Sequence, residues 1–180
     1  MLAGFFKLLS NYDQNMKKVI AGIVLVLFFG CQENDGVTTD FTGNETVYTL
    51  QAGSVYPISG TATFKEKKDG SAVVIISLTG TEGDLQHPVH VHLGNISSPD
   101  AAVAASLNPV TGSTGKSETA VTMLADETSV TYTQLIALGA CIKVHLADSG
   151  PDRDIILAGG NIGSSASARA SGEIAVCKSE

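Results

Sequence analysis

Short runs of apolar and β-branched residues, separated by turn residues, recur along most of the chain and predict β-strands. Such runs cover residues 46–51, 58–66, 72–78, 89–93, 103–107, 119–124, 141–146, 155–157 and 172–177. Many short strands with frequent turns are typical of a sandwich or a barrel. We therefore predict an all-β domain over residues 46–180, a Greek-key β-sandwich of about eight strands.

One pair of neighbouring strands has a specific turn signal. Lys68-Asp69-Gly70-Ser71 separates the second and third runs, and Asp-Gly favours a tight hairpin, so these strands should pair antiparallel. Alternation along them places Ala62 and Phe64 on one face and Thr61 and Thr63 on the other. Residues 132–138 give the only helix that we expect after residue 31, about two turns long.

The N-terminal segment has the pattern of an export signal. Met16-Lys17-Lys18 is followed by the apolar residues 19–29 and by Gly30-Cys31. The apolar stretch is shorter than the ~20 residues that span a bilayer. The segment resembles a bacterial lipoprotein signal, in which the chain is cut before a cysteine that then carries lipid. An uncleaved signal anchor is the alternative, because Phe28 and Phe29 are bulky for a cleavage site.

The lipoprotein resemblance implies a domain organisation and a location. Residues 1–30 would be the signal peptide, with Met16 as an alternative start. Cys31 would be the lipidated residue, and residues 31–45, which are polar and acidic where they follow it, would be a flexible tether to the lipid membrane. We thus expect a membrane-anchored protein of the cell envelope. The expected anchor is in the outer membrane, and the sequence does not decide whether the domain faces the periplasm or the cell surface.

The charge balance excludes one class of partner. The chain has 11 Lys and Arg against 18 Asp and Glu, a formal net charge of −7 at pH 7. Binding to a phosphate backbone needs a cationic surface, so no nucleic-acid partner is expected.

Two further cysteines, Cys141 and Cys177, form an even pair in a chain that we expect to be exported. An oxidising compartment permits a disulfide between them, which would stabilise the fold by about 3 to 4 kcal/mol in the chain-entropy model. Two buried thiols are the alternative, because reduced cysteine packs as a small apolar residue.

The histidines are the strongest candidates for chemistry. His87, His90 and His92 lie in one predicted strand, and His145 lies in another. Residues two apart on a strand point to the same face, about 6 to 7 Å apart, so His90 and His92 could share one metal ion. His145 could be the third ligand if the two strands lie side by side, and three imidazoles suit copper or zinc. The alternative is hydrogen-bonded core or surface histidines, and we expect that role for His87.

Several motifs resemble the copper–zinc superoxide dismutases. His87-Pro88-Val89-His90-Val91-His92 is similar to that family's His-Gly-Phe-His-Val-His strand, whose second and third histidines bind copper. Val144-His145 is similar to its Val-Val-His, which gives another copper ligand. The glycine-rich residues 160–164 and the segment 172–176 also match, in order. The resemblance implies a copper site made by His90, His92 and His145.

The chain departs from that family where zinc is bound. Ser106-Leu107-Asn108-Pro109 stands where the family has His-Phe-Asn-Pro, so the histidine that bridges copper and zinc is missing. Residues 110–117 contain no histidine or carboxylate. Ser165 stands where the family has its active-site arginine, and Arg169 comes four residues later. A zinc site of the family type is therefore not expected.

A second resemblance is to chordin-type (CHRD) domains. That family has an Ala/Val-His-Ile-His-x-Gly strand and a Val-x-Val-His strand, to which Val89-His90-Val91-His92-Leu93-Gly94 and Ile142-Lys143-Val144-His145 are similar. This resemblance implies an extracellular binding or structural module. We thus predict a lipid-anchored module that binds one copper ion. The alternative is a copper-only superoxide dismutase-like enzyme that converts superoxide to oxygen and hydrogen peroxide.

Overall fold

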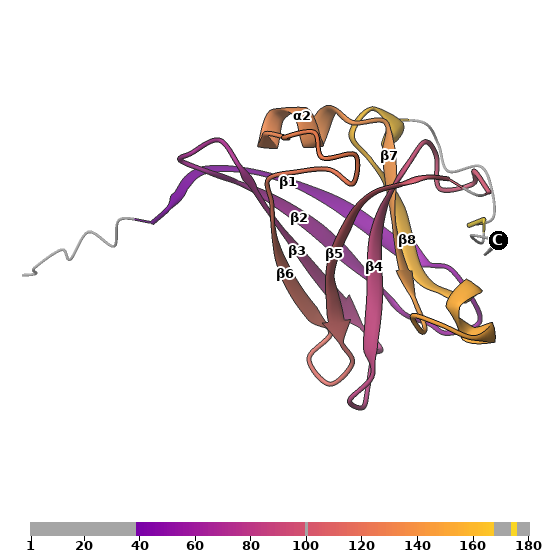
Figure 1. Ribbon diagram of the computed structural model, residues 1–180. Coiled ribbons are helices and arrows are strands. Elements are labelled where there is room, and N and C mark those ends of the chain that lie inside the picture. The colour runs from indigo at the N-terminus through magenta and orange to yellow at the C-terminus, as the bar shows by residue number, and fades with distance from the viewer. Residues whose placement is uncertain (1–38, 100, 168–173, 176–180) are drawn as a thin grey trace, which may run out of the picture. The chain divides into compact units, whose positions relative to one another are not determined.

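The computed structural model describes residues 39–99, 101–167 and 174–175, which form an all-β domain (Figure 1). The strands are β1 (Phe41–Ala52), β2 (Ser59–Lys67), β3 (Ala72–Thr79), β4 (Gln86–Leu93), β5 (Val103–Thr111), β6 (Lys116–Val121), β7 (Ala140–His145) and β8 (Ile156–Ile162). The prediction of an all-β domain with about eight strands is confirmed. Of the predicted strand at residues 172–177, only Ile174 and Ala175 are described, and neither lies in a strand.

The predicted hairpin joins β2 and β3. The two strands pair antiparallel from Ser59↔Thr79 to Glu66↔Ala72. In the turn, the Asp69 carboxylate accepts hydrogen bonds from the backbone N–H and the hydroxyl of Ser71 at 2.9 and 2.6 Å. These bonds lower the pKa of Asp69, because they stabilise its charged form. Gly70 has a φ of +83°, which a residue without a Cβ adopts at no steric cost.

The strands form one closed sheet, and the predicted two-sheet sandwich is not confirmed. The order around the barrel is β1-β2-β3-β6-β5-β4-β7-β8, and all neighbours are antiparallel. Two of its junctions are short: β1 meets β8 at Gln51↔Gly159 and Ala52↔Ala158, and β5 meets β6 at Thr111↔Lys116. Because the strands pair at both junctions, the sheet closes into one barrel instead of forming two facing sheets.

Several strand ends differ from the sequence prediction. β1 begins at Phe41, within the range expected for the tether, and β8 runs through the glycine-rich residues to Ile162. Gly160 permits this path, because a Cβ there would lie 2.2 Å from the backbone oxygen of Thr49 on β1. The glycine lets the two strands come close together, and they pair nearby at Gln51↔Gly159.

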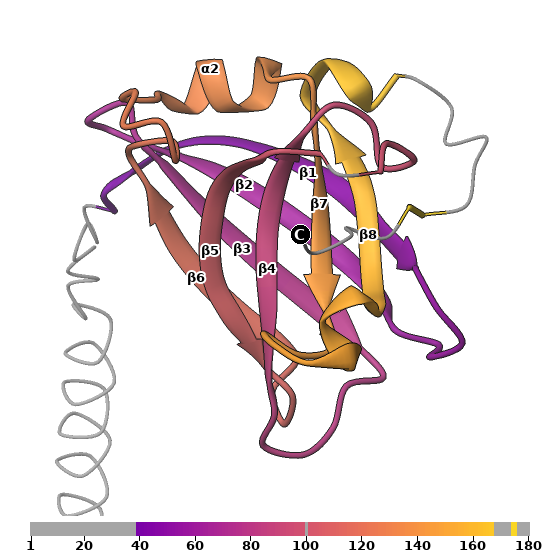
Figure 2. The same cartoon turned by 45° about the vertical axis from the view of Figure 1, so that its right-hand side comes forward.

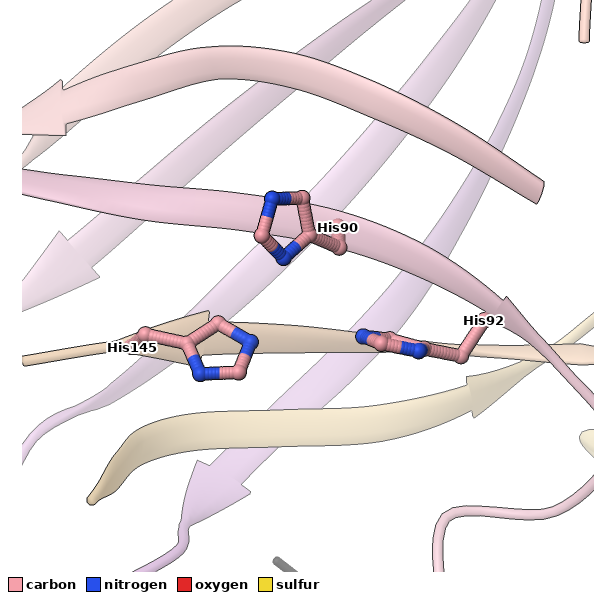
Figure 3. Close-up of side chains that lie close together, drawn as sticks. All are labelled: His90, His92 and His145. Atoms are coloured by element: carbon pink, nitrogen blue, oxygen red, sulfur yellow. The ribbon is translucent and has the colours of Figure 1, made fainter. Parts of the chain in front are cut away.

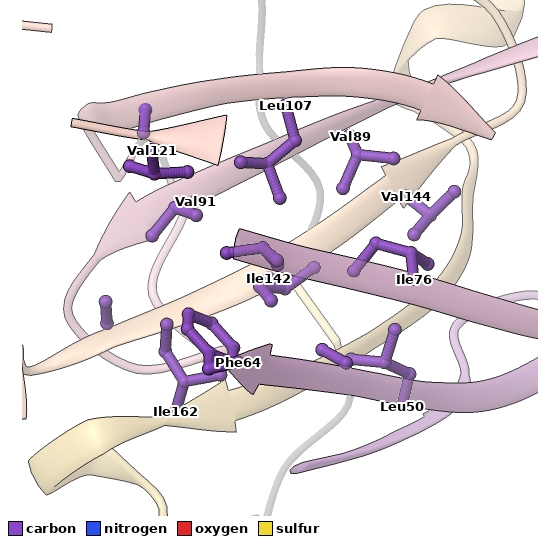
Figure 4. Close-up of a cluster of buried hydrophobic side chains, with 14 of the residues drawn as sticks. Leu50, Phe64, Ile76, Val89, Val91, Leu107, Val121, Ile142, Val144 and Ile162 are labelled. Carbon is purple, nitrogen blue, oxygen red and sulfur yellow. The ribbon is translucent and has the colours of Figure 1, made fainter. Parts of the chain in front are cut away.

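The hydrophobic core fills the inside of the barrel (Figure 4). It takes every second residue of most strands, as a pleated strand with one buried face requires. Ala62 and Phe64 are fully buried on β2, while Thr61 and Thr63 are half-buried, which confirms the predicted face. The Phe64 ring packs edge-on against Tyr48 with 5.4 Å between ring centres.

A short helix, α2 (Tyr132–Ala137), lies across one end of the barrel (Figures 1 and 2). Its N-terminus has a capping box, in which the Thr131 hydroxyl accepts from Gln134 N–H and the Gln134 side chain accepts from Thr131 N–H. Tyr132 and Leu135 are buried against the core. A 3₁₀ turn, η1 (Pro151–Asp154), follows β7 at the other end of the barrel (Figure 2), and the backbone oxygen of Arg153 in this turn contacts the ring of His145.

Candidate metal centre

β4 and β7 bring the histidines together because they are neighbours in the barrel. The antiparallel register pairs Val89 with Val144, His90 with Lys143 and His92 with Cys141. Val89, Val91, Ile142 and Val144 belong to the core. Alternation therefore turns His90, His92 and His145 to the opposite face of the sheet.

The three rings point toward a common space (Figure 3). The ring centres lie 5.1 Å apart for His90 and His145, 5.7 Å for His90 and His92, and 6.2 Å for His92 and His145. One ring nitrogen from each lies within 4.8 Å of the others. A metal ion with nitrogen ligands at about 2.0 to 2.1 Å needs ligand atoms about 3.5 Å apart, so a small inward movement of the side chains would complete the site.

Backbone carbonyls orient two of these rings. Nδ1–H of His92 donates to the oxygen of Ala101 at 2.7 Å, and Nδ1–H of His145 donates to the oxygen of Arg153 at 2.8 Å. A carbonyl oxygen only accepts, so Nδ1 carries the proton in both rings and the lone pair is on Nε2. Such bonds fix the tautomer and the orientation of metal-binding histidines.

His145 also has a buried polar atom with no partner. Its Nε2 is shielded from solvent and makes no hydrogen bond. A buried acceptor without a partner costs about 1 to 3 kcal/mol. A bound metal ion would use this lone pair, so the residues present fit a metal centre.

The surroundings keep all three imidazoles neutral. Burial is the main cause, because it removes water from the charged form of each ring. Burial first, and then the charges of His145, His92 and Arg153, together lower the pKa of His90 to about 4. The pKa values of His92 and His145 are also lowered, although their bonds to Ala101 and Arg153 act in the opposite direction. Neutral imidazole is the form that binds metals.

These pKa shifts predict how the stability of the metal-free protein depends on pH. The folded-state pKa values lie below the unfolded value of 6.5, so above that pH the rings are neutral in both states. As the pH falls from 6.5 toward 4, the unfolded chain binds protons that the folded chain does not, and the free energy of unfolding decreases. Urea unfolding should show a lower midpoint at pH 5.0 than at pH 7.5. His90→Asn should reduce this difference, and an equal difference in that variant would contradict the explanation.

The other candidate residues lie outside the cluster. His87 is buried on β4 and donates from Nδ1 to the oxygen of Leu146 at 3.2 Å, as expected for a hydrogen-bonded histidine. Cys141 is buried in β7. Cys31 and Cys177 are outside the described residues, so the lipidation and the disulfide stay predictions.

Sequence reasoning missed one residue of this face, Lys143. It is fully buried and directly opposite His90 in the register. A signal was available, because Lys143 lies two residues before His145 on an otherwise apolar strand, and that spacing places both residues on one face.

Comparisons with known proteins add no further assignment. A scan against models of protein families, a search of curated proteins and a search of solved structures each gave no match to this chain. Among residues 39–99, 101–167 and 174–175, no helix has the length and apolar character needed to cross a membrane.

Proposed function

We propose that this protein is a lipid-anchored module of the cell envelope that binds one copper ion through His90, His92 and His145. The observation that carries the proposal is the convergence of three neutral imidazoles on one face, with two of them oriented by backbone carbonyls. Nitrogen donors suit both copper and zinc. Copper binds such sites more tightly than zinc among divalent ions, which favours copper here.

The N-terminal sequence supports the proposed location, and the strand order supports the proposed family resemblance. The lipoprotein-like segment ending at Cys31 supports export and anchoring, in the outer membrane with the domain facing either side. The strand order β7-β4-β5-β6 supports a Greek-key arrangement, since it places a fourth strand beside the first of three consecutive ones. That arrangement agrees with a superoxide dismutase-like or CHRD-type domain, and a CHRD-type module does not need the missing zinc ligands.

Dismutation of superoxide is the second candidate function. Arg153 acts electrostatically on His90 and His145, and Lys143 on His92 and His145, so positive charge at this face could attract an anion. Against it, Ser106 lies directly opposite His90, where the resemblance would place the bridging histidine. We therefore favour the binding module.

Metal analysis tests the proposal. The full-length chain, purified in mild detergent with Cys31→Ser to remove one thiol, is loaded with copper with and without ascorbate, dialysed, and analysed for metal content. We expect one copper per chain. His92→Asn should lose it, while His87→Asn, a buried histidine outside the cluster, should keep it. Equal copper content in the Cys31→Ser protein and in its His92→Asn variant would overturn the proposal.

A dismutase assay on the same loaded protein separates the two candidate functions. The binding module predicts rates no higher than those of the His92→Asn variant treated in the same way. Fast copper-dependent turnover that is lost in His92→Asn would instead establish the enzyme.

A further inference from the structure

A buried lysine shares the face of the barrel that carries the three histidines. Lys143 and His145 are two residues apart on β7, and Lys143 is the register partner of His90 on β4. Its side chain has an exposed fraction of 0%. Charged lysines are rarely buried this completely. An ammonium group here is poorly screened by solvent, so its field acts strongly on its neighbours.

The end of the Lys143 side chain is fixed by the backbone of a distant segment. Its Nζ donates to the oxygen of Ala175 at 2.6 Å, and the N–H of Ala175 donates to the oxygen of Ile96 at 3.1 Å. These contacts fix the position of Nζ, and the charge of Lys143 acts on His92 and His145.

Two further charged residues of the described segments, Arg153 and Asp154, act on the cluster. Arg153 on η1 is exposed and acts on His90 and His145, as Lys143 does on His92 and His145. Asp154 is half-buried and acts on His145 in the opposite sense. The three histidines form the candidate ligand set without a carboxylate among the described residues. None of these three ligands carries a negative charge that would offset the charge of a bound ion.

We propose that Lys143, reinforced by Arg153, makes the three-histidine centre prefer monovalent copper over divalent copper and zinc. The inference rests on the proposed function. Repulsion between a fixed positive charge and a bound ion is proportional to the ion's charge, so it is twice as large for Cu(II) or Zn(II) as for Cu(I). Three ligands also suit Cu(I), whereas Cu(II) favours tetragonal sites with more ligands.

The test compares the dissociation constants of both copper states in full-length protein with Cys31→Ser. Cu(I) is measured under ascorbate by competition with a Cu(I)-specific chelator, and Cu(II) is measured by competition with an amino-acid chelator. Lys143→Met keeps the apolar stem and removes the charge. We expect it to lower the ratio of the Cu(II) to the Cu(I) dissociation constant at least tenfold, which is a fall of about 59 mV in the copper reduction potential.

Two further variants keep the test decisive. Arg153→Gln leaves the backbone oxygen that orients His145 and should lower the same ratio by about twofold to threefold, even if Lys143→Met does not fold. Lys116→Met, at an exposed position of β6, is the matched control and should leave the ratio unchanged. If Arg153→Gln, and Lys143→Met where it folds, give the same ratio as the Cys31→Ser protein within experimental error, this inference is overturned and the proposed function is not. Absence of stoichiometric copper in both states would instead overturn the proposed function on which it rests.

Discussion

His145→Asn should weaken copper binding more than 100-fold and leave the barrel folded. The asparagine amide can take the place of Nδ1–H and donate to the oxygen of Arg153, a bond that His145 makes at 2.8 Å. The variant then lacks only Nε2, the nitrogen that would bind the metal. Loss of a partner that merely orients a ligand typically costs 10-fold to 100-fold in affinity, so loss of the ligand itself should cost more. Competition with a chelator measures the change.

The same variant makes a separate prediction for the metal-free protein. Nε2 of His145 is buried without a partner, and its removal relieves a desolvation cost of about 1 to 3 kcal/mol. The metal-free variant should therefore be at least as stable in urea as the parent. A large loss of stability together with unchanged copper affinity would mean that His145 has a structural role, like the buried, hydrogen-bonded His87.

Local alternation predicted the strands, but it could not predict the closed barrel. The β2–β3 hairpin follows from Asp69-Gly70 and from the apolar faces on each side, which are all within one short stretch. Closure depends on β1 meeting β8 and on β5 meeting β6. The β1–β8 pairing joins edges that are distant in sequence, while β5 and β6 are consecutive strands that pair at Thr111↔Lys116. The free energy of each pairing depends on register and twist, which the apolar pattern does not encode.

Gly160 illustrates the ambiguity of a short motif. Glycine beside asparagine is typical of a turn, and the apolar run that predicts this strand, residues 155–157, ends before it. In the fold the same glycine lies within β8, where a Cβ would collide with the oxygen of Thr49. A missing side chain serves equally well for a turn or for a close approach of two strands. The sequence does not distinguish these uses.

The candidate site could be predicted in part. His90 and His92 follow from two-residue spacing on one strand, while the place of His145 depended on a resemblance and on the assumption that two distant strands are neighbours. The oxygens of Ala101 and Arg153 could not be predicted, because every residue has a backbone carbonyl and only the folded chain shows which one a ring contacts.

Phe64→Ala should show the opposite behaviour to His145→Asn. Phe64 is among the largest fully buried side chains and packs edge-on against Tyr48 inside the barrel. Truncation leaves a cavity that the closed sheet cannot fill by collapse, so we expect a loss of about 3 to 5 kcal/mol in the free energy of unfolding. Urea unfolding of the metal-free protein at pH 7.5 measures this loss, and His87→Asn provides a reference for a smaller change in the interior.

Copper affinity in Phe64→Ala should remain within about threefold of the parent while the variant is folded. The ring lies on β2, and the metal-binding histidines lie on the outward faces of β4 and β7, so the truncation removes no ligand or orienting bond. A parallel fall in stability and affinity would show that the inside of the barrel and the histidine face are coupled. Separate effects in the two variants would show that the core maintains the fold, and that the alternating outer residues carry the chemistry.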